Sequence, residues 1–166
     1  MRLALSLLAF FVITNSCNKK NIAGGNIVEI YSLKTVQFVP NKCQVDASRS
    51  MIEDTPLVTN HDIVEYAKTN YEFKLTDEGI QRLQTLRTRN AFAVTVNKMV
   101  IYYGIYMPDY LSSSCDHSIT MGLSWSPDNK IRMRLGYPGQ LQSVTIDDKR
   151  NDPKLLAALA DQNKLR

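Results

Sequence analysis

A short stretch near the middle of the chain restricts the possible folds more than any other. Residues Tyr71–Leu75 alternate apolar and polar side chains, which is typical of a half-buried strand. Thr76 then offers an N-cap oxygen, and Ile80, Leu83 and Leu86 recur at helical spacing. A strand that leads directly into an amphipathic helix predicts a helix packed on a sheet.

Most of the other predicted elements are strands. Runs rich in β-branched and aromatic residues predict these strands: Asn26–Leu33, Phe92–Val96, Met99–Tyr106, Ile119–Trp125, Ile131–Leu135 and Val144–Ile146. Asn97-Lys98 separates two of them and favours a tight hairpin turn. Gln37–Pro56 has no sustained period and is expected to be a long loop, which makes it a candidate recognition segment.

Two further helices are predicted from their N-terminal signals. Asp152 is a suitable N-cap and Pro153 suits the first helical position, so a C-terminal helix begins there. Thr59 or Asn60 would cap a short helix that runs through Tyr66. This short helix would precede the alternating strand.

The order of these elements predicts the fold class. It is an α+β domain with a mainly antiparallel sheet, a βαββ unit, helices on one face and a C-terminal helix. The segment Asp147–Asp152 mixes both charges and is expected to be a solvated connection before that last helix.

Part of this pattern resembles a known family. In Leu75–Gly79 a strand ends and a helix begins with two acidic residues followed by a glycine. Phe92–Ile101 contains an apolar strand, a polar turn and the start of a second strand. In these features Tyr71–Pro108 resembles the head subdomain of the first periplasmic domain of SecD. The resemblance implies a βαββ unit on the non-cytoplasmic side of a membrane and carries over no catalytic residue.

The N-terminus has the features of an export signal. Arg2 precedes the apolar run Leu3–Ile13, which is too short to span the roughly 30 Å of a bilayer core. Small residues and Cys17 follow, and the segment resembles a bacterial lipoprotein signal with the looser lipobox of Bacteroidetes-type bacteria. An ordinary signal peptide cut near Ser16 and an uncleaved anchor remain as alternatives.

The lipoprotein interpretation divides the chain into three parts. Residues 1–16 are the signal peptide, 17–26 are the lipidated cysteine and a tether, and 27–166 are a single α+β domain. Acyl chains of the palmitate type on Cys17 would anchor the protein stably in a membrane. Since neither Asn18 nor Lys19, directly after Cys17, is acidic, we expect the bacterial outer membrane, with the domain facing the periplasm.

The two other cysteines have two possible states. In an exported protein Cys43 and Cys115 would more often form a disulfide than remain free thiols. Such a bridge closes a long loop and would contribute about 4 kcal/mol in the chain-entropy model. The sequence does not show whether the two residues approach each other.

Cys115 and His117 have three interpretations. They could be a nucleophile and its general base, or two metal ligands. Alternatively, Cys115 forms a disulfide and His117 is an ordinary surface residue. A metal site would need further ligands, and the only other histidine is His61. The exported location favours the bridge, so we expect no cofactor and no metal site.

Aromatic residues offer a candidate binding surface. Aromatic rings with polar tips suit contacts with sugars, peptides or proteins. The candidate residues are Tyr102, Tyr106, Tyr110 and Trp125. Tyr102 and Tyr106 share one face of a predicted strand, so burial in the core is the alternative for them.

These features favour a non-enzymatic function. The net charge of +4 is small and lysines and arginines are not clustered, which does not indicate nucleic acid as a partner. We expect a lipid-anchored binding or scaffolding module of the cell envelope, attached to the membrane through Cys17, with an envelope protein or glycan as its partner. The alternative is an exported hydrolase or metal-dependent enzyme that uses Cys115 and His117.

Overall fold

The computed structural model describes residues 25–123 and 128–166. Their strands are β1 (Val28–Thr35), β2 (Met51–Ile52), β3 (Ile63–Ala67), β4 (Glu72–Leu75), β5 (Ala91–Val96), β6 (Met99–Tyr106), β7 (Cys115–Leu123) and β8 (Lys130–Tyr137). The helices are α1 (Asp77–Leu83) and α2 (Pro153–Asp161). The predicted α+β class is confirmed, including the C-terminal helix.

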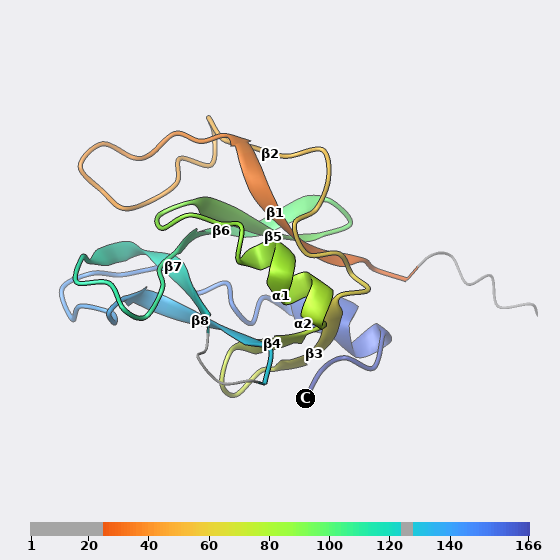
Figure 1. Cartoon of the computed structure of the whole chain (residues 1–166). Coiled ribbons are helices and arrows are strands. Elements are labelled where there is room, and N and C mark those ends of the chain that lie inside the picture. The colour runs from red at the N-terminus through yellow and green to blue at the C-terminus, as the bar shows by residue number, and fades with distance from the viewer. Residues whose placement is uncertain (1–24, 124–127) are drawn as a thin grey trace, which may run out of the picture.

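The strands form one sheet in the order β2-β1-β5-β6-β7-β8-β4-β3. Strands β6 and β7 are parallel, and the other neighbouring strands are antiparallel. Figure 1 shows the sheet bending from β1 and β5 at the top of the view, through β7 and β8, to β4 and β3 at the bottom. Ile30 and Val58 exchange two backbone hydrogen bonds of 2.9 Å, which link β1 to the segment before β3. The sheet therefore curls until its two ends approach each other.

The predicted βαββ unit is present in chain order as β4-α1-β5-β6. Thr76 caps α1, and its hydroxyl accepts a hydrogen bond from Gly79 N at 3.2 Å. The predicted turn joins β5 to β6, where Asn97 and Lys98 have φ values of 51° and 63°, as a type I′ hairpin requires. In the sheet, three strands separate β4 from β5, so α1 carries the polypeptide across the sheet.

Both helices bury apolar residues in the same core. Ile80 and Leu83 of α1 and Leu155 and Leu159 of α2 belong to one cluster with side chains from the sheet. Asp152 caps α2 through a hydrogen bond from Lys154 N at 2.9 Å. A second, smaller cluster contains Ile105, Met107, Cys115 and Tyr137. Among the described residues no helix is long and apolar enough to cross a membrane.

Two local predictions were wrong. The segment after Thr59 and Asn60 is strand β3, because β4 pairs with one edge of it and C-terminal residues with the other. Tyr66 N donates to Lys164 O at 2.7 Å on that outer edge. Val144–Ile146 is not a strand and lies in a connection between β8 and α2.

The charged connection before α2 is also less solvated than predicted. Arg150 is only 8% exposed. Its guanidinium stacks on Tyr71 at 3.6 Å from the ring centroid and pairs with Asp148 at 2.8 Å. Hydrogen bonds from Arg150 lower the pKa of Asp148 although burial opposes this. Arg150 is therefore part of the core packing.

Candidate functional site

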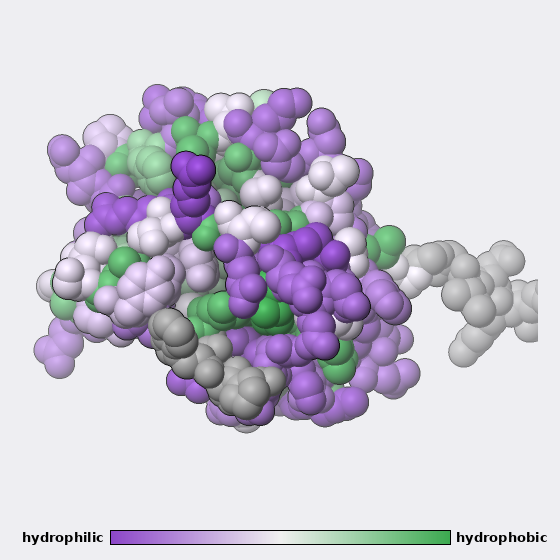
Figure 2. Space-filling view, viewed as in Figure 1, coloured by the Kyte–Doolittle hydropathy of each residue, from purple (hydrophilic) through white to green (hydrophobic). Residues whose placement is uncertain are grey.

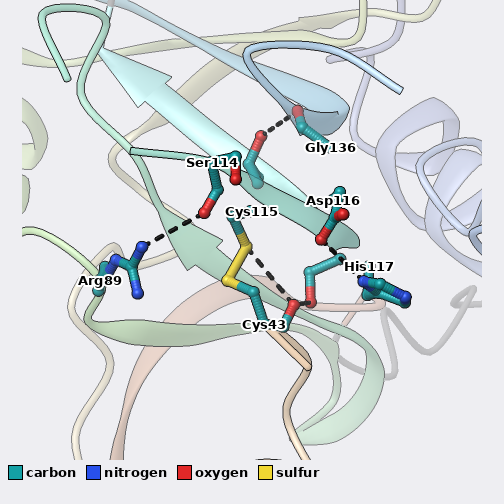
Figure 3. Close-up of a disulfide and its surroundings, with 9 residues drawn as sticks. Cys43, Arg89, Ser114, Cys115, Asp116, His117 and Gly136 are labelled. Carbon is teal, nitrogen blue, oxygen red and sulfur yellow. Dashed lines mark hydrogen bonds and ion pairs between the residues drawn. A yellow bond between two sulfur atoms is a disulfide. The ribbon is translucent and has the colours of Figure 1, made fainter. Parts of the chain in front are cut away.

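The β1–β2 loop, residues 36–50, is tied to the sheet by a disulfide. Cys43 is bonded to Cys115 at the start of β7, 72 positions along the sequence, with a Cα–Cα distance of 5.2 Å. Ser118 Oγ donates to Cys43 O at 2.7 Å. The predicted disulfide is thus present, and it holds the middle of the loop against β7 (Figure 3).

Hydrogen bonds within the loop give it a defined shape. Val39 N donates to Gln44 O at 2.9 Å, and Asp46 N donates to Gln37 O at 2.7 Å. Between them Asn41 adopts a φ of 59°, which reverses the backbone direction. The loop predicted as irregular is therefore a small hairpin, and the segment after it contributes the short strand β2.

An apolar groove lies between this hairpin and the sheet. It has a volume of about 550 Å³, and its lining includes Phe38, Pro40, Lys42, Arg89 and Ile105. Ile105 is fully buried, whereas Phe38 is 41% exposed. Figure 2 shows apolar surface among polar atoms in the upper-left part of the view, where Figure 1 places the β1–β2 loop. We call this feature the cationic groove, because Lys42 and Arg89 are the charged residues that line it.

A smaller cleft lies on the other side of the disulfide. Strand β6 pairs with β7 only over Gly104–Tyr106, so the strands separate before that point. The cleft between them has a volume of about 220 Å³, and its lining includes Tyr103, His117 and Lys149. Figure 3 shows Arg89 and His117 on opposite sides of the disulfide.

His117, which lines this cleft, has a carboxylate partner next to it in the sequence. Its Nδ1 lies 2.8 Å from Asp116 Oδ1, and this hydrogen bond lowers the pKa of the Asp116 carboxyl. Cys115 Sγ is engaged in the disulfide and is buried. Within the described residues, His, Cys, Asp and Glu side chains form no group of three that would hold a metal ion. The predicted Cys115 and His117 are thus neighbours, but only the histidine is available to a ligand while the bridge is intact.

The predicted aromatic surface is not assembled as expected. Tyr102 and Tyr106 are 5% and 7% exposed and belong to the main core, where burial raises the pKa of both hydroxyls. This burial does not fit the exposed aromatic surface that the sequence predicts, although Tyr102 is among the residues that line the smaller cleft. Tyr110 is 68% exposed in the connection between β6 and β7. Trp125 and the predicted lipidation site Cys17 lie outside the described residues.

The residues of the cationic groove were not recognised individually in the sequence. Phe38 and Lys42 lie in the long loop that the sequence marked as a recognition segment, but Arg89 is distant from them along the sequence. The hairpin between Phe38 and Val45 and the Cys43–Cys115 bond bring the two regions together. Cys43 was the one feature of the sequence that could have indicated contact between the loop and the sheet.

Comparisons of this protein with protein-family models, with curated proteins and with solved structures find no match.

Proposed function

We propose that this protein is a lipid-anchored binding module of the bacterial cell envelope. In this proposal acyl chains on Cys17 attach it to the outer membrane, residues 17–26 form the tether and the domain faces the periplasm. The export signal and cysteine in the sequence support the anchor. The geometry of the β1–β2 loop supports the binding role.

The position of the loop relative to the tether is the observation that carries the proposal. Strand β1 has 8 residues, which at about 3.3 Å per residue separate its ends by roughly 25 Å. The tether enters at Asn26, and the β1–β2 loop leaves at the opposite end (Figure 1). A domain held at one end of β1 therefore presents this loop away from its anchor.

The covalent restraint on the loop also favours binding. A loop already held in one conformation loses little conformational entropy when a partner binds. The β1–β2 loop has both a disulfide and internal backbone hydrogen bonds. Its exposed side chains are thus displayed on a rigid support.

Cell fractionation of the Cys17→Ala variant tests the anchor. We expect the unaltered protein in the outer-membrane fraction and the variant in the soluble periplasmic fraction, because the acylated thiol is lost. A Ser16→Ala variant is the control and should fractionate like the unaltered protein. Membrane association of Cys17→Ala equal to that of the control would reject the anchor.

A pull-down from envelope extract tests the binding role. The full-length protein serves as bait beside a loop variant, Phe38→Ser/Lys42→Glu, and a control variant, Lys154→Glu, altered at an exposed position of α2. We expect a component that the unaltered and control baits retain and the loop variant loses. Equal retention by all three baits would contradict a role for the loop.

The enzymatic alternative has one observation in its favour. The Asp116–His117 pair is a histidine oriented by a carboxylate, as in general-base and metal sites. The disulfide leaves no thiolate at Cys115 to act with it. Metal analysis of the purified full-length protein, with His117→Ala as control, tests the metal-dependent form. A stoichiometric metal lost in the variant would favour an enzyme over a binding module.

A further inference from the structure

The cationic groove combines an apolar interior with a positive rim. Its inner side is formed by Ile105 and Cys43, and Phe38 and Pro40 border its opening. Its volume of about 550 Å³ is within the range of pockets that enclose small ligands or a few peptide residues. An apolar side chain would lose contact with water on entering it, which favours binding.

Its two cations differ from other cations on the same end of the domain. Lys34 pairs with Asp54 at 3.6 Å, and Arg49 pairs with Asp46 at 2.7 Å. By contrast, neither Lys42 nor Arg89 forms an ion pair with any residue in the described part of the protein, and the groove lining contains no carboxylate. The groove therefore lacks the negative charge that would complement its rim.

The position of Arg89 is restrained despite its exposure. Arg89 Nη2 donates to Ser114 O at 3.3 Å, next to the disulfide (Figure 3). Arg89 itself has a positive φ of 66°, and its N–H donates to Tyr106 O at 2.9 Å. The guanidinium is thus held beside the groove and keeps further N–H donors for an anion.

From these contacts we propose that the cationic groove binds an extended peptide with an apolar side chain next to a carboxylate. The apolar side chain lies between Phe38 and Ile105, and the carboxylate pairs with Arg89 and Lys42. This assignment rests on the proposed binding function and names its partner as a polypeptide. The carboxylate belongs to an acidic side chain or to the C-terminus of the peptide, which present the same anion.

The location of the groove favours a peptide over the membrane that holds the anchor. The groove is at the end of β1 opposite the tether, as the path of β1 shows in Figure 1. A lipid surface is broad and would also contact Lys34 and Arg49, whose charges are already paired with aspartates. A peptide fits the narrow site where the unpaired cations and the apolar interior coincide.

Selection from two libraries of displayed random heptapeptides tests the proposal. One library has a free C-terminal carboxylate, and the other is fused to its carrier through the C-terminus. The target is the detergent-solubilised full-length protein. We expect enriched peptides with an apolar residue within two positions of an acidic side chain or of the free C-terminus. Enrichment in both libraries assigns the carboxylate to side chains, whereas enrichment in the free library alone assigns it to the C-terminus.

Affinities of a selected peptide, labelled with fluorescein, for three variants then locate its site. We expect Arg89→Glu and Lys42→Glu each to weaken binding about 10-fold or more, since a charge-assisted contact becomes repulsive. Lys154→Glu has the same change of charge outside the groove and should bind like the unaltered protein.

Three results would overturn the proposal. They are the absence of enriched peptides, enriched peptides without a carboxylate, and equal affinity for Arg89→Glu and Lys154→Glu. Arg89-dependent sedimentation of the unaltered protein with phosphatidylglycerol vesicles, without peptide enrichment, would assign the groove to lipid instead. If the pull-down still depends on the loop, the binding function stands and only the peptide assignment fails.

Discussion

The two ends of strand β1 are both held by residues distant in the sequence, but by different chemistry. At the end that the proposed tether enters, which we call the tether end, Asn97 Oδ1 accepts a hydrogen bond from Ile27 N at 2.8 Å, and Asn97 Nδ2 donates to Asn26 Oδ1 at 2.9 Å. Gln162 Nε2 donates to Asn26 O. The polar groups at this end are thus satisfied by one another.

At the loop end a single covalent bond provides the main restraint. The disulfide holds the β1–β2 loop, while Phe38, Lys42 and Arg89 face solvent beside the cationic groove. Polar groups that satisfy one another contribute to stability and leave little for a ligand. A rigid support with exposed apolar and charged side chains has the opposite properties. Substitutions at the tether end should therefore reduce stability, and those of the exposed groove residues Phe38, Lys42 and Arg89 should reduce binding.

The largest effect on stability should come from the bond that makes the loop rigid. We expect Cys43→Ser/Cys115→Ser to lower the free energy of unfolding by about 4 kcal/mol, because a closed loop of this length restricts the unfolded state. Urea unfolding under oxidising conditions measures the difference. The unaltered protein in reductant is the control and should approach the variant, whereas a loss below about 1 kcal/mol would show that the loop is held by other contacts.

Substitution of Asp62 should have the next largest effect on the free energy of unfolding. It is 4% exposed in the turn before β3, next to Asn60, whose Oδ1 accepts a hydrogen bond from Val28 N at 3.0 Å. Burial alone would raise the pKa of Asp62, but hydrogen bonds from Arg82 and Thr59 outweigh it and lower the pKa to about 2. We expect Asp62→Asn to cost about 2 kcal/mol at pH 7.

The lowered pKa of Asp62 determines how its contribution to stability changes with pH. Because the folded-state pKa of Asp62 lies below its ordinary value of about 3.9, the carboxylate contributes its full stabilisation above about pH 4. That contribution is lost as the pH falls from about 4 to 2, where Asp62 becomes protonated in the folded state. Urea unfolding over this range should show a steeper loss for the unaltered protein than for Asp62→Asn. Parallel curves would contradict the account.

A smaller loss is expected at the tether end itself. Asn97→Gly keeps the positive φ of the turn but removes the hydrogen bonds to Asn26 and Ile27. We expect a loss of about 1 kcal/mol in urea unfolding. Binding of the selected peptide to the folded variant should not change. Weakened binding would show that the two ends of β1 are coupled.

The smallest effect on stability should accompany substitutions in the groove. Phe38→Ser and Arg89→Glu change exposed side chains, so each should alter the free energy of unfolding by less than about 0.5 kcal/mol. Both should weaken peptide binding. Thermal unfolding and fluorescence anisotropy on the same samples separate the two properties. A stability loss above about 1 kcal/mol would place these residues in the supporting structure.

The elements of the fold that could be predicted are those determined by interactions between residues close together in the sequence. Thr76 and Asp152 cap helices through neighbouring backbone groups, and Asn97-Lys98 forms its turn because both residues tolerate a positive φ. Strand β3 was mistaken for a helix, since the hydrogen bonds on its two edges come from β4 and from Lys164 and Arg166. The pairing with Lys164 and Arg166 is long-range and has no local signal in the sequence.

The candidate site shows the same division. The sequence indicated the long loop through its composition and the Cys43–Cys115 bond through the predicted export signal. It did not indicate Arg89, which reaches the loop only through the folding of the sheet. For Tyr102, alternation identified the strand but not which face of it is buried. Solvent exposure depends on the whole sheet and on the helices that cover it.

Photo-crosslinking in living cells tests the contrast between the two ends of β1 most directly. Benzoylphenylalanine is placed at Phe38, which is 41% exposed at the loop end, or at Met99, which is 57% exposed near the tether end. We expect a crosslinked envelope protein for position 38 and none for position 99, with the disulfide intact in both variants. A crosslink at position 99 and none at position 38 would contradict it.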